Sequence, residues 1–315
     1  MHPRWKKMGL IFRPEGQHGW MNSHAQVPTV LVDEQNELVR VYFASRPEQS
    51  LSLTTYVDLD IHDLSRVVYL HPDPILSPGG MGMFDEHGIM PSSVVRNGDQ
   101  VFLYYSGWSR GTTLPYNNFT GLAISEDGGR TFEKFSKGPI IDRTPTELYS
   151  ATSPHVHRKG ENDWWMIYCS GLDWVEVDGK LEHLYDLKVA RSDDGIRWDQ
   201  EGNTAIGQAH MEEAITKPTV AKLGDTYAMW FCFRGAGDFR GGKNSYRIGY
   251  AESTDLIHWE RRDENAGISS SDGEWDSEMI AYPAAIKIKE DYYLFYNGND
   301  FGKDGFGIAR LENFS

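Results

Sequence analysis

A repeat of about 64 residues limits what this chain can fold into more than any other feature of its sequence. Each copy has a proline followed by an apolar run and then an aromatic-rich run, as in "KPTVAK" and "YAMWFCFRG". The prolines are separated by 63, 63, 64 and 65 residues, and stand at Pro28, Pro91, Pro154, Pro218 and Pro283. Self-similarity at a fixed period of this size is typical of propellers and other repeat folds.

A third element follows the aromatic-rich run in most copies. It reads as a strand that ends in a Ser-x-Asp turn, for example in "LKVARSDDGIRWDQ" and "IGYAESTDLIHWERR". The Asp side chain can accept hydrogen bonds from the backbone amides of its own turn. An aromatic residue (Phe132, Trp198 or Trp259) then begins a fourth, outer strand. Three or four short strands with turns between them are the unit of a β-propeller blade.

The repeats predict an all-β fold, a single five-bladed β-propeller domain that spans residues 1–315 with about 64 residues per blade. The outer part of the first copy, "TTYVDLDIHDLSRVVYL", is degenerate, and the last copy stops one strand short at "GFGIARLENFS". We expect the N-terminal segment "WKKMGLIFRP" to supply the missing outer strand and close the ring. Closure leaves only short, protected strand edges.

Charge and hydropathy exclude several partners. The formal net charge of −15 repels nucleic acid and anionic membranes. No apolar run reaches 18 residues, and "MGLIF" is too short for the apolar region of a signal peptide. Cys169 and Cys232 lie in apolar runs and are interpreted as buried thiols, so we expect a cytoplasmic protein. The oligomeric state is left open.

Carboxylates recur at the entrances of the first strands. Glu86, Glu213 and Glu278 each stand five residues before a repeat proline, while Asp85 and Asp276 stand six and seven before. In a propeller the first strand of each blade lines the axis, so we expect these carboxylates to form an acidic axial pocket and to be the catalytic candidates. Crowding keeps one carboxyl protonated, and an acid that faces a carboxylate can cleave a glycosidic bond. The alternative is that they cap turns or face solvent.

Aromatic, polar and basic side chains near these entrances suit a carbohydrate or a sugar conjugate. Aromatic rings can stack on sugar faces, amides can bind hydroxyls, and basic groups can hold an anionic group such as phosphate. The alternatives are packing between blades for the rings and pairing with the axial acids for the basic groups. The substrate-binding candidates are Trp20, Asn22, His24, Arg46, His87, Tyr149, Lys217, Arg234, Tyr282 and Asn297.

Histidines of successive copies raise the question of a metal. His24, His87 and His155 are expected near the axis, but they lack the short fixed spacing of a zinc motif. We therefore expect no cofactor, with a metal ion bound near these histidines as the alternative.

Several segments resemble the five-bladed propeller glycosidases, a superfamily of arabinanases and xylosidases, invertase-like enzymes and mannoside phosphorylases. They include "GWMNSHAQVP", "EEAITKPTV" and "EWDSEMIAYP". The resemblance implies carbohydrate metabolism, with glycan or nucleotide-sugar synthesis as a setting, and it covers the full length.

The chain departs from that superfamily's pattern at the catalytic positions of the first repeat. In the invertase signature an Asp nucleophile follows Trp-Met-Asn, and Ser23 stands there. In the arabinanase group an Asp directly precedes the first proline, where this chain has Val27, and the equivalent third-repeat residue is Ser153. The resemblance implies that Glu213 is the general acid.

Three functional hypotheses follow. The first is a glycoside hydrolase in which Glu213 acts as acid and a second carboxylate activates water. The second is a phosphorylase or glycosyl transferase in which Arg46, Lys217 and Arg234 hold the anion. The third is a propeller that binds sugar without cleaving it.

Overall fold

Residues 2–48 and 51–314 are described by a computed structural model, in which nearly all regular structure is β-strand. No helix in these ranges is long and apolar enough to cross a membrane. The short helical segments are η1 (Glu34–Asn36), η2 (Asp263–Asn265) and α1 (Asn299–Gly302). The strands are β1 (Pro3–Phe12), β2 (Ser23–Asp33), β3 (Leu38–Arg46), β4 (Leu53–Asp60), β5 (Asp63–Leu70), β6 (Gly88–Asn97), β7 (Gln100–Arg110), β8 (Tyr116–Ser125), β9 (Glu133–Lys134), β10 (Ala151–Gly160), β11 (Asp163–Val177), β12 (Lys180–Ser192), β13 (Asp199–Ile206), β14 (Glu213–Leu223), β15 (Thr226–Gly235), β16 (Arg247–Ser253), β17 (Glu260–Arg261), β18 (Ala281–Ile288), β19 (Asp291–Asn297) and β20 (Phe306–Phe314).

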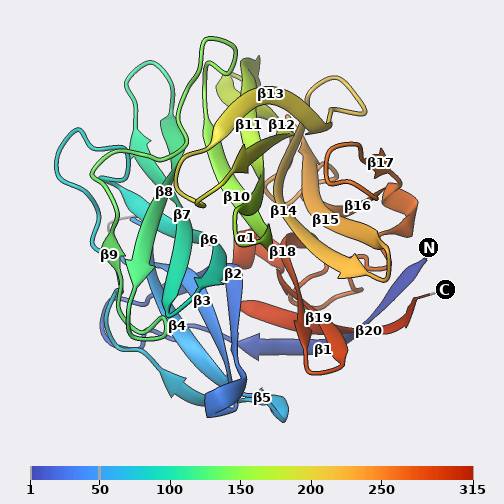
Figure 1. Cartoon of the computed structure of the whole chain (residues 1–315). Coiled ribbons are helices and arrows are strands. Elements are labelled where there is room, and N and C mark those ends of the chain that lie inside the picture. The colour runs from blue at the N-terminus through green and yellow to red at the C-terminus, as the bar shows by residue number, and fades with distance from the viewer. Residues whose placement is uncertain (1, 49–50, 315) are drawn as a thin grey trace.

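The strands pair with their neighbours in chain order as four-stranded antiparallel meanders. The meanders are β2 to β5, β6 to β9, β10 to β13, β14 to β17, and β18 to β20 with β1. Single parallel bridges, Phe119 with Ala151 and Tyr185 with Ala214, join the three middle meanders into one sheet. The first strand of each meander lies toward the centre of the molecule (Figure 1). The structure therefore places these first strands near the centre, as the sequence predicts.

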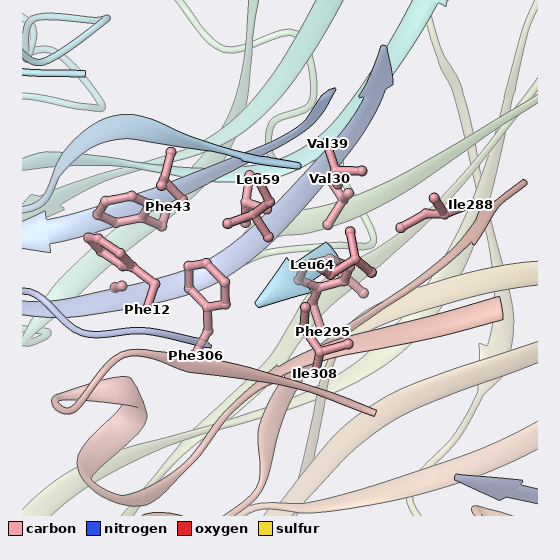
Figure 2. Packing of buried hydrophobic residues seen from close by; sticks show 14 of the residues in the cluster. Phe12, Val30, Val39, Phe43, Leu59, Leu64, Ile288, Phe295, Phe306 and Ile308 are labelled. Atoms are coloured by element: carbon pink, nitrogen blue, oxygen red, sulfur yellow. The ribbon is translucent and has the colours of Figure 1, made fainter. Parts of the chain in front are cut away.

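The N-terminal strand β1 pairs antiparallel with β20 at the outer edge of the last meander, as the sequence predicts. A hydrophobic core lies between this meander and the first one, and Figure 2 shows its rings and aliphatic chains in contact. The ring of Phe12 lies 5.0 Å from that of Phe43 and 5.8 Å from that of Phe306. Burial of such rings stabilises the packing of the chain's two ends by about 1.5–3 kcal/mol per side chain.

The fourth strands and the cysteines follow the sequence predictions. Strands β9, β13 and β17 each begin directly after the aromatic residue expected to start them. The turns before them are closed as predicted, since Asp194 accepts hydrogen bonds from the backbone amides of Ile196 and Arg197. Cys169 and Cys232 are both free and buried.

Candidate active site

A cavity of about 690 Å³ opens among the central strands. The residue directly before each repeat proline lines it, and these five are Val27, Met90, Ser153, Lys217 and Tyr282. Side chains at one repeated position therefore do line the cavity. That position is one residue before each proline, whereas the carboxylates expected there stand five to seven residues before it. We call these five residues the cavity register.

Local backbone distortion directs the side chains of the cavity register into the cavity. Val27, Ser153, Lys217 and Tyr282 have φ values of 56°, 49°, 50° and 54°. At each of them the pairing between the first and second strand shifts register, as in a β-bulge. A bulge re-aims a side chain, and a positive φ costs a non-glycine residue about 1–3 kcal/mol. Strain repeated in four copies is the kind that proteins keep at functional sites.

The amide of Asn297 holds one of these bulges. Its Oδ1 accepts a hydrogen bond from the Val27 backbone at 2.8 Å, and its Nδ2 donates to the carbonyls of Ala25 and Gly305 at 2.8 and 2.7 Å. Asn297 is fully buried and does not line the cavity. The structure therefore gives this predicted sugar ligand a supporting role in the wall behind the site.

Hydroxyl, amide and aromatic groups make up much of the cavity wall. Gln26, Thr152 and Thr216, each two residues before a repeat proline, contribute polar groups. A largely apolar wall with a few placed polar groups is typical of small-molecule sites. Further lining residues include Ser106, Trp108, Tyr116, Asn118, Ser150, His183, Tyr185, Phe239, Tyr246 and Phe301.

The cavity is cationic, which corrects the prediction of an acidic axial pocket. Glu182 is the one carboxylate among the lining residues that the structure describes. It accepts hydrogen bonds at 2.7 and 3.1 Å from the two terminal nitrogens of Arg240. The basic side chains in the wall are Arg46, Lys180, Lys217, Arg234 and Arg240.

The predicted catalytic carboxylate Asp276 points into its own meander and away from the cavity. It is fully buried, and its Oδ2 accepts hydrogen bonds from Lys7 Nζ at 2.5 Å and from the Tyr296 hydroxyl at 3.0 Å. Lys7 lies on β1 and Tyr296 on β19, so one carboxylate ties the entrance loop to the second and fourth strands. Buried ionised groups need such partners because an unpaired charge is costly away from water.

The second meander repeats this arrangement with Asp85. Its Oδ2 accepts from Lys134 Nζ on β9 at 2.5 Å and from the Tyr105 hydroxyl on β7 at 3.2 Å. In the third meander Glu147 accepts from the hydroxyls of two β11 residues, Tyr168 and Ser170. The entrance acids therefore hold their own meanders together.

Glu213, the residue that the resemblance marks as general acid, is held in the same manner. Arg261 on β17 donates to its two carboxylate oxygens at 2.7 and 2.9 Å, and the Ala209 amide donates at 2.7 Å. Glu213 is 5% exposed and does not line the cavity. We call Asp85, Glu147, Glu213 and Asp276 the entrance carboxylates.

The last two catalytic candidates are loop residues. Glu86 accepts a hydrogen bond from the Gly82 amide at 2.7 Å and lies 3.4 Å from His87. Glu278 is exposed, and its backbone is held by Asn299. Neither lines the cavity, so the structure does not bring the five predicted carboxylates together there.

Four of the ten substrate-binding candidates line the cavity, namely Arg46, Lys217, Arg234 and Tyr282. Burial lowers the pKa of Lys217 to about 8, and its Nζ donates to the Ser92 carbonyl at 3.0 Å. The candidates outside the cavity are Trp20, Asn22, His24, His87, Tyr149 and Asn297. Of these, Trp20 donates to the Pro72 carbonyl and Tyr149 to Asp173.

In the part of the chain that the structure describes, no group of three or more His, Cys, Asp or Glu side chains is placed to hold a metal ion. His24 is buried beside Ser23, whose Oγ lies 2.8 Å from its Nδ1. Burial, followed by the charge of Arg46, lowers the pKa of His24 to about 3. His24 is therefore uncharged at neutral pH.

The residues that sequence reasoning missed fall into two kinds. Thr152 and Thr216 each stand two residues before a repeat proline, so an alignment of the copies at that position would have found them. Glu182, His183 and Tyr185 lie on β12, and Arg240 and Tyr246 lie in the 236–246 loop. No periodic signal in the sequence marks these five residues.

The four-stranded meanders, their central first strands and the cavity among them define a protein of the β-propeller class. The family model "Glycosyl hydrolases family 32 N-terminal domain" matches residues 63–250. The chain belongs to this family, and with it to the five-bladed β-propeller glycoside hydrolase superfamily that the sequence motifs indicate. It is thus homologous to the propeller glycoside hydrolases.

Similar proteins agree with this assignment. The uncharacterized protein Rv1502 of Mycobacterium tuberculosis strain H37Rv is 35% identical over 312 residues, covering 98% of this chain and 99% of its own. A solved structure described as a glycoside hydrolase has a TM-score of 0.75 at 18% identity, covering 100% of this chain and 93% of its own. A thermostable family-43 glycoside hydrolase has a TM-score of 0.68 at 16% identity, covering 93% of this chain and 91% of its own. At these identities the two structures show the fold alone.

Proposed function

We propose that this chain is a carbohydrate-active enzyme that cleaves or transfers a glycosidic bond inside the central cavity. One observation carries the proposal: the residues before all five repeat prolines line a single cavity in a chain of the glycosidase superfamily. The wall combines aromatic rings with hydroxyl and amide groups, which suits the apolar faces and polar edges of a sugar.

The architecture that we propose for this function is one closed domain of five blades. Each repeat contributes one antiparallel meander, and the pairing of β1 with β20 supports closure of the ring by the N-terminal strand. The core shared by the first and last meanders supports the same closure. A closed ring keeps the first strands, and hence the cavity register, at fixed positions about one axis.

Within this function, transfer of the glycosyl group to an anionic acceptor such as phosphate fits the cavity better than hydrolysis. Hydrolysis with inversion uses two carboxyl groups on opposite sides of the sugar. The described wall offers one, Glu182, and it also offers basic groups that can hold an acceptor anion. In the transfer an acceptor oxygen bonds to the anomeric carbon, the glycosidic bond breaks, and the proton lost by the acceptor passes to the leaving oxygen. Glu182 is our candidate for moving that proton.

The test is an activity screen on aryl glycosides and short oligosaccharides, with and without inorganic phosphate. We expect wild type to release the aglycone faster with phosphate, and Glu182→Gln to lower kcat by about 10² or more. Glu278→Gln, an exposed carboxylate outside the cavity, is the matched control. Release that needs no phosphate and survives Glu182→Gln contradicts transfer. An inert wild type that still binds sugar makes the protein a sugar-binding propeller.

A further inference from the structure

The cavity's charge runs against that of the whole molecule. The chain carries a formal net charge of −15, yet basic side chains outnumber carboxylates among the described lining residues. Low-dielectric walls that carry one sign of charge concentrate oppositely charged ligands. A neutral sugar does not need such a field, so the charge points to a second property of the ligand.

Four of the five lining cations lack a carboxylate partner within residues 2–48 and 51–314; Lys180 is exposed, and Arg46, Lys217 and Arg234 contact uncharged groups. Arg46 donates to the amide oxygen of Gln26 at 3.0 Å, and Lys217 donates to a backbone carbonyl. Arg234 donates to the carbonyls of Gly235 and His183 at 2.8 and 3.0 Å. Buried cations are costly without a counter-charge, so an anion that enters the cavity gains interactions that the protein itself does not satisfy.

Arg234 is held rigidly for such a role. It is 3% exposed, and its guanidinium lies 3.7 Å from the ring centre of Phe239 and 5.4 Å from that of Tyr185. The hydroxyls of Tyr185 and Tyr246 lie 2.7 Å apart beside it. Its buried Nε has no hydrogen-bond partner among the described residues. Arg234 lines the cavity, and a guanidinium fixed by such contacts is suited to a carboxylate, sulfate or phosphate group.

Neutral polar groups lie next to this cation. His183 stacks on Trp174 with ring centres 4.2 Å apart, and burial, followed by the charge of Arg234, lowers its pKa to about 3. His183 Nε2 and Ser150 Oγ are both buried and unpartnered in the described chain, and both lie against Gly171. An uncharged imidazole and a hydroxyl can exchange hydrogen bonds with sugar hydroxyls. His183 and Ser150 both line the cavity, so side chains that can bind hydroxyls lie in the same wall as Arg234.

We infer that the central cavity takes a carbohydrate together with an anionic oxygen group, which Arg234 binds with help from Arg46 and Lys217. This inference rests on the proposed function and deepens it by naming the substrate class. The anionic group has two chemical sources: an acidic substituent on the sugar, or an inorganic acceptor bound beside a neutral sugar.

The test is isothermal titration calorimetry at neutral pH and low salt. The probes are glucose, galactose and mannose, each with its uronic acid and its 6-phosphate, and inorganic phosphate alone and with each neutral sugar. We expect one charged sugar to bind at least about tenfold more tightly than its neutral parent, and Arg234→Met to weaken the charged sugar by about 30-fold or more. Arg310→Met, which removes an exposed arginine paired with Asp291, is the matched control and should change neither affinity.

The outcomes separate the two sources and the two proposals. If phosphate binds alone and raises the affinity for a neutral sugar, the anion subsite is supported and the anion is assigned to a second substrate. Equal affinity for charged and neutral sugars, with no gain from phosphate, overturns the anion subsite and leaves the proposed function standing. No sugar binding and no turnover overturn both. If Arg234→Met fails to fold by circular dichroism, Lys217→Met carries the same comparison.

Discussion

The entrance carboxylates and the cavity register lie only a few residues apart in four of the five repeats, yet their side chains point to different places. Asp276 and Glu213 end in ion pairs inside their own meanders. Tyr282 and Lys217, six and four residues further on, line the cavity. The entrance carboxylates hold a blade together, whereas the cavity register presents side chains to a ligand. Residues that recur at one position of a sequence repeat can therefore have a structural role as readily as a functional one.

The largest effect that tests this contrast is the loss of a buried ion pair. Asp276→Ala leaves Lys7 and the Tyr296 hydroxyl without their shared acceptor. We expect the free energy of unfolding to fall by about 3–5 kcal/mol, measured by urea denaturation. Asp291→Ala, which breaks an exposed pair with Arg310, should leave the free energy of unfolding nearly unchanged. Similar losses for the two variants would contradict the structural role of Asp276.

A smaller effect comes from the pair that holds the predicted general acid. In a double-mutant cycle of Glu213→Gln with Arg261→Met, we expect a coupling of about 1–3 kcal/mol in unfolding free energy, since the two side chains share two hydrogen bonds. Sugar affinity should stay within about threefold of wild type in the folded variants. A coupling energy near zero, together with loss of turnover in Glu213→Gln, would contradict the structural role and support a catalytic role for Glu213.

The cavity register should respond to pH through Lys217. Burial places the pKa of Lys217 at about 8, so its positive charge is present below that pH and lost as pH rises through it. Two titratable groups near Lys217 stay uncharged from pH 7 to 9, because burial lowers the pKa of His155 and raises that of Cys232 to about 12. We expect affinity for the charged sugar to fall about 3- to 10-fold over this range, measured calorimetrically. The fall should vanish in Lys217→Met, and its persistence there would assign the titration to another group.

The last prediction concerns backbone strain in the cavity register itself. Val27 and Val30 are both buried on β2, but only Val27 has a positive φ. Glycine relieves that strain, so Val27→Gly should cost about 1–2 kcal/mol less unfolding free energy than Val30→Gly. Equal costs in thermal or chemical denaturation would show that the bulge at Val27 stores no strain.

Much of the fold could be predicted from the sequence, because the strands and turns of each propeller repeat are marked by signals within that repeat's own sequence. The structure has the strand pairings predicted from the spaced prolines and from the aromatic residues that precede the outer strands. It also has the pairing of β1 with β20, which the sequence predicts because the last copy is one strand short. The cytoplasmic location stays a prediction.

The site was harder to predict for two physical reasons. Side chains alternate regularly only along an undistorted strand, and at the bulge the adjacent residues Thr216 and Lys217 both line the cavity. The partners of the entrance carboxylates are also distant in sequence, as Lys7 is from Asp276. Without knowledge of such partners, a repeated acid near an axis looks like a catalytic group.

The most direct measurement is the position of a bound sugar in a crystal soaked with the tightest ligand from the calorimetric panel. We predict electron density for the ring beside Ser153, Lys217 and Tyr282, with the anionic group at Arg234. A sugar bound over the Glu213–Arg261 pair or at Asp276, with the central cavity filled only by solvent, would contradict the account.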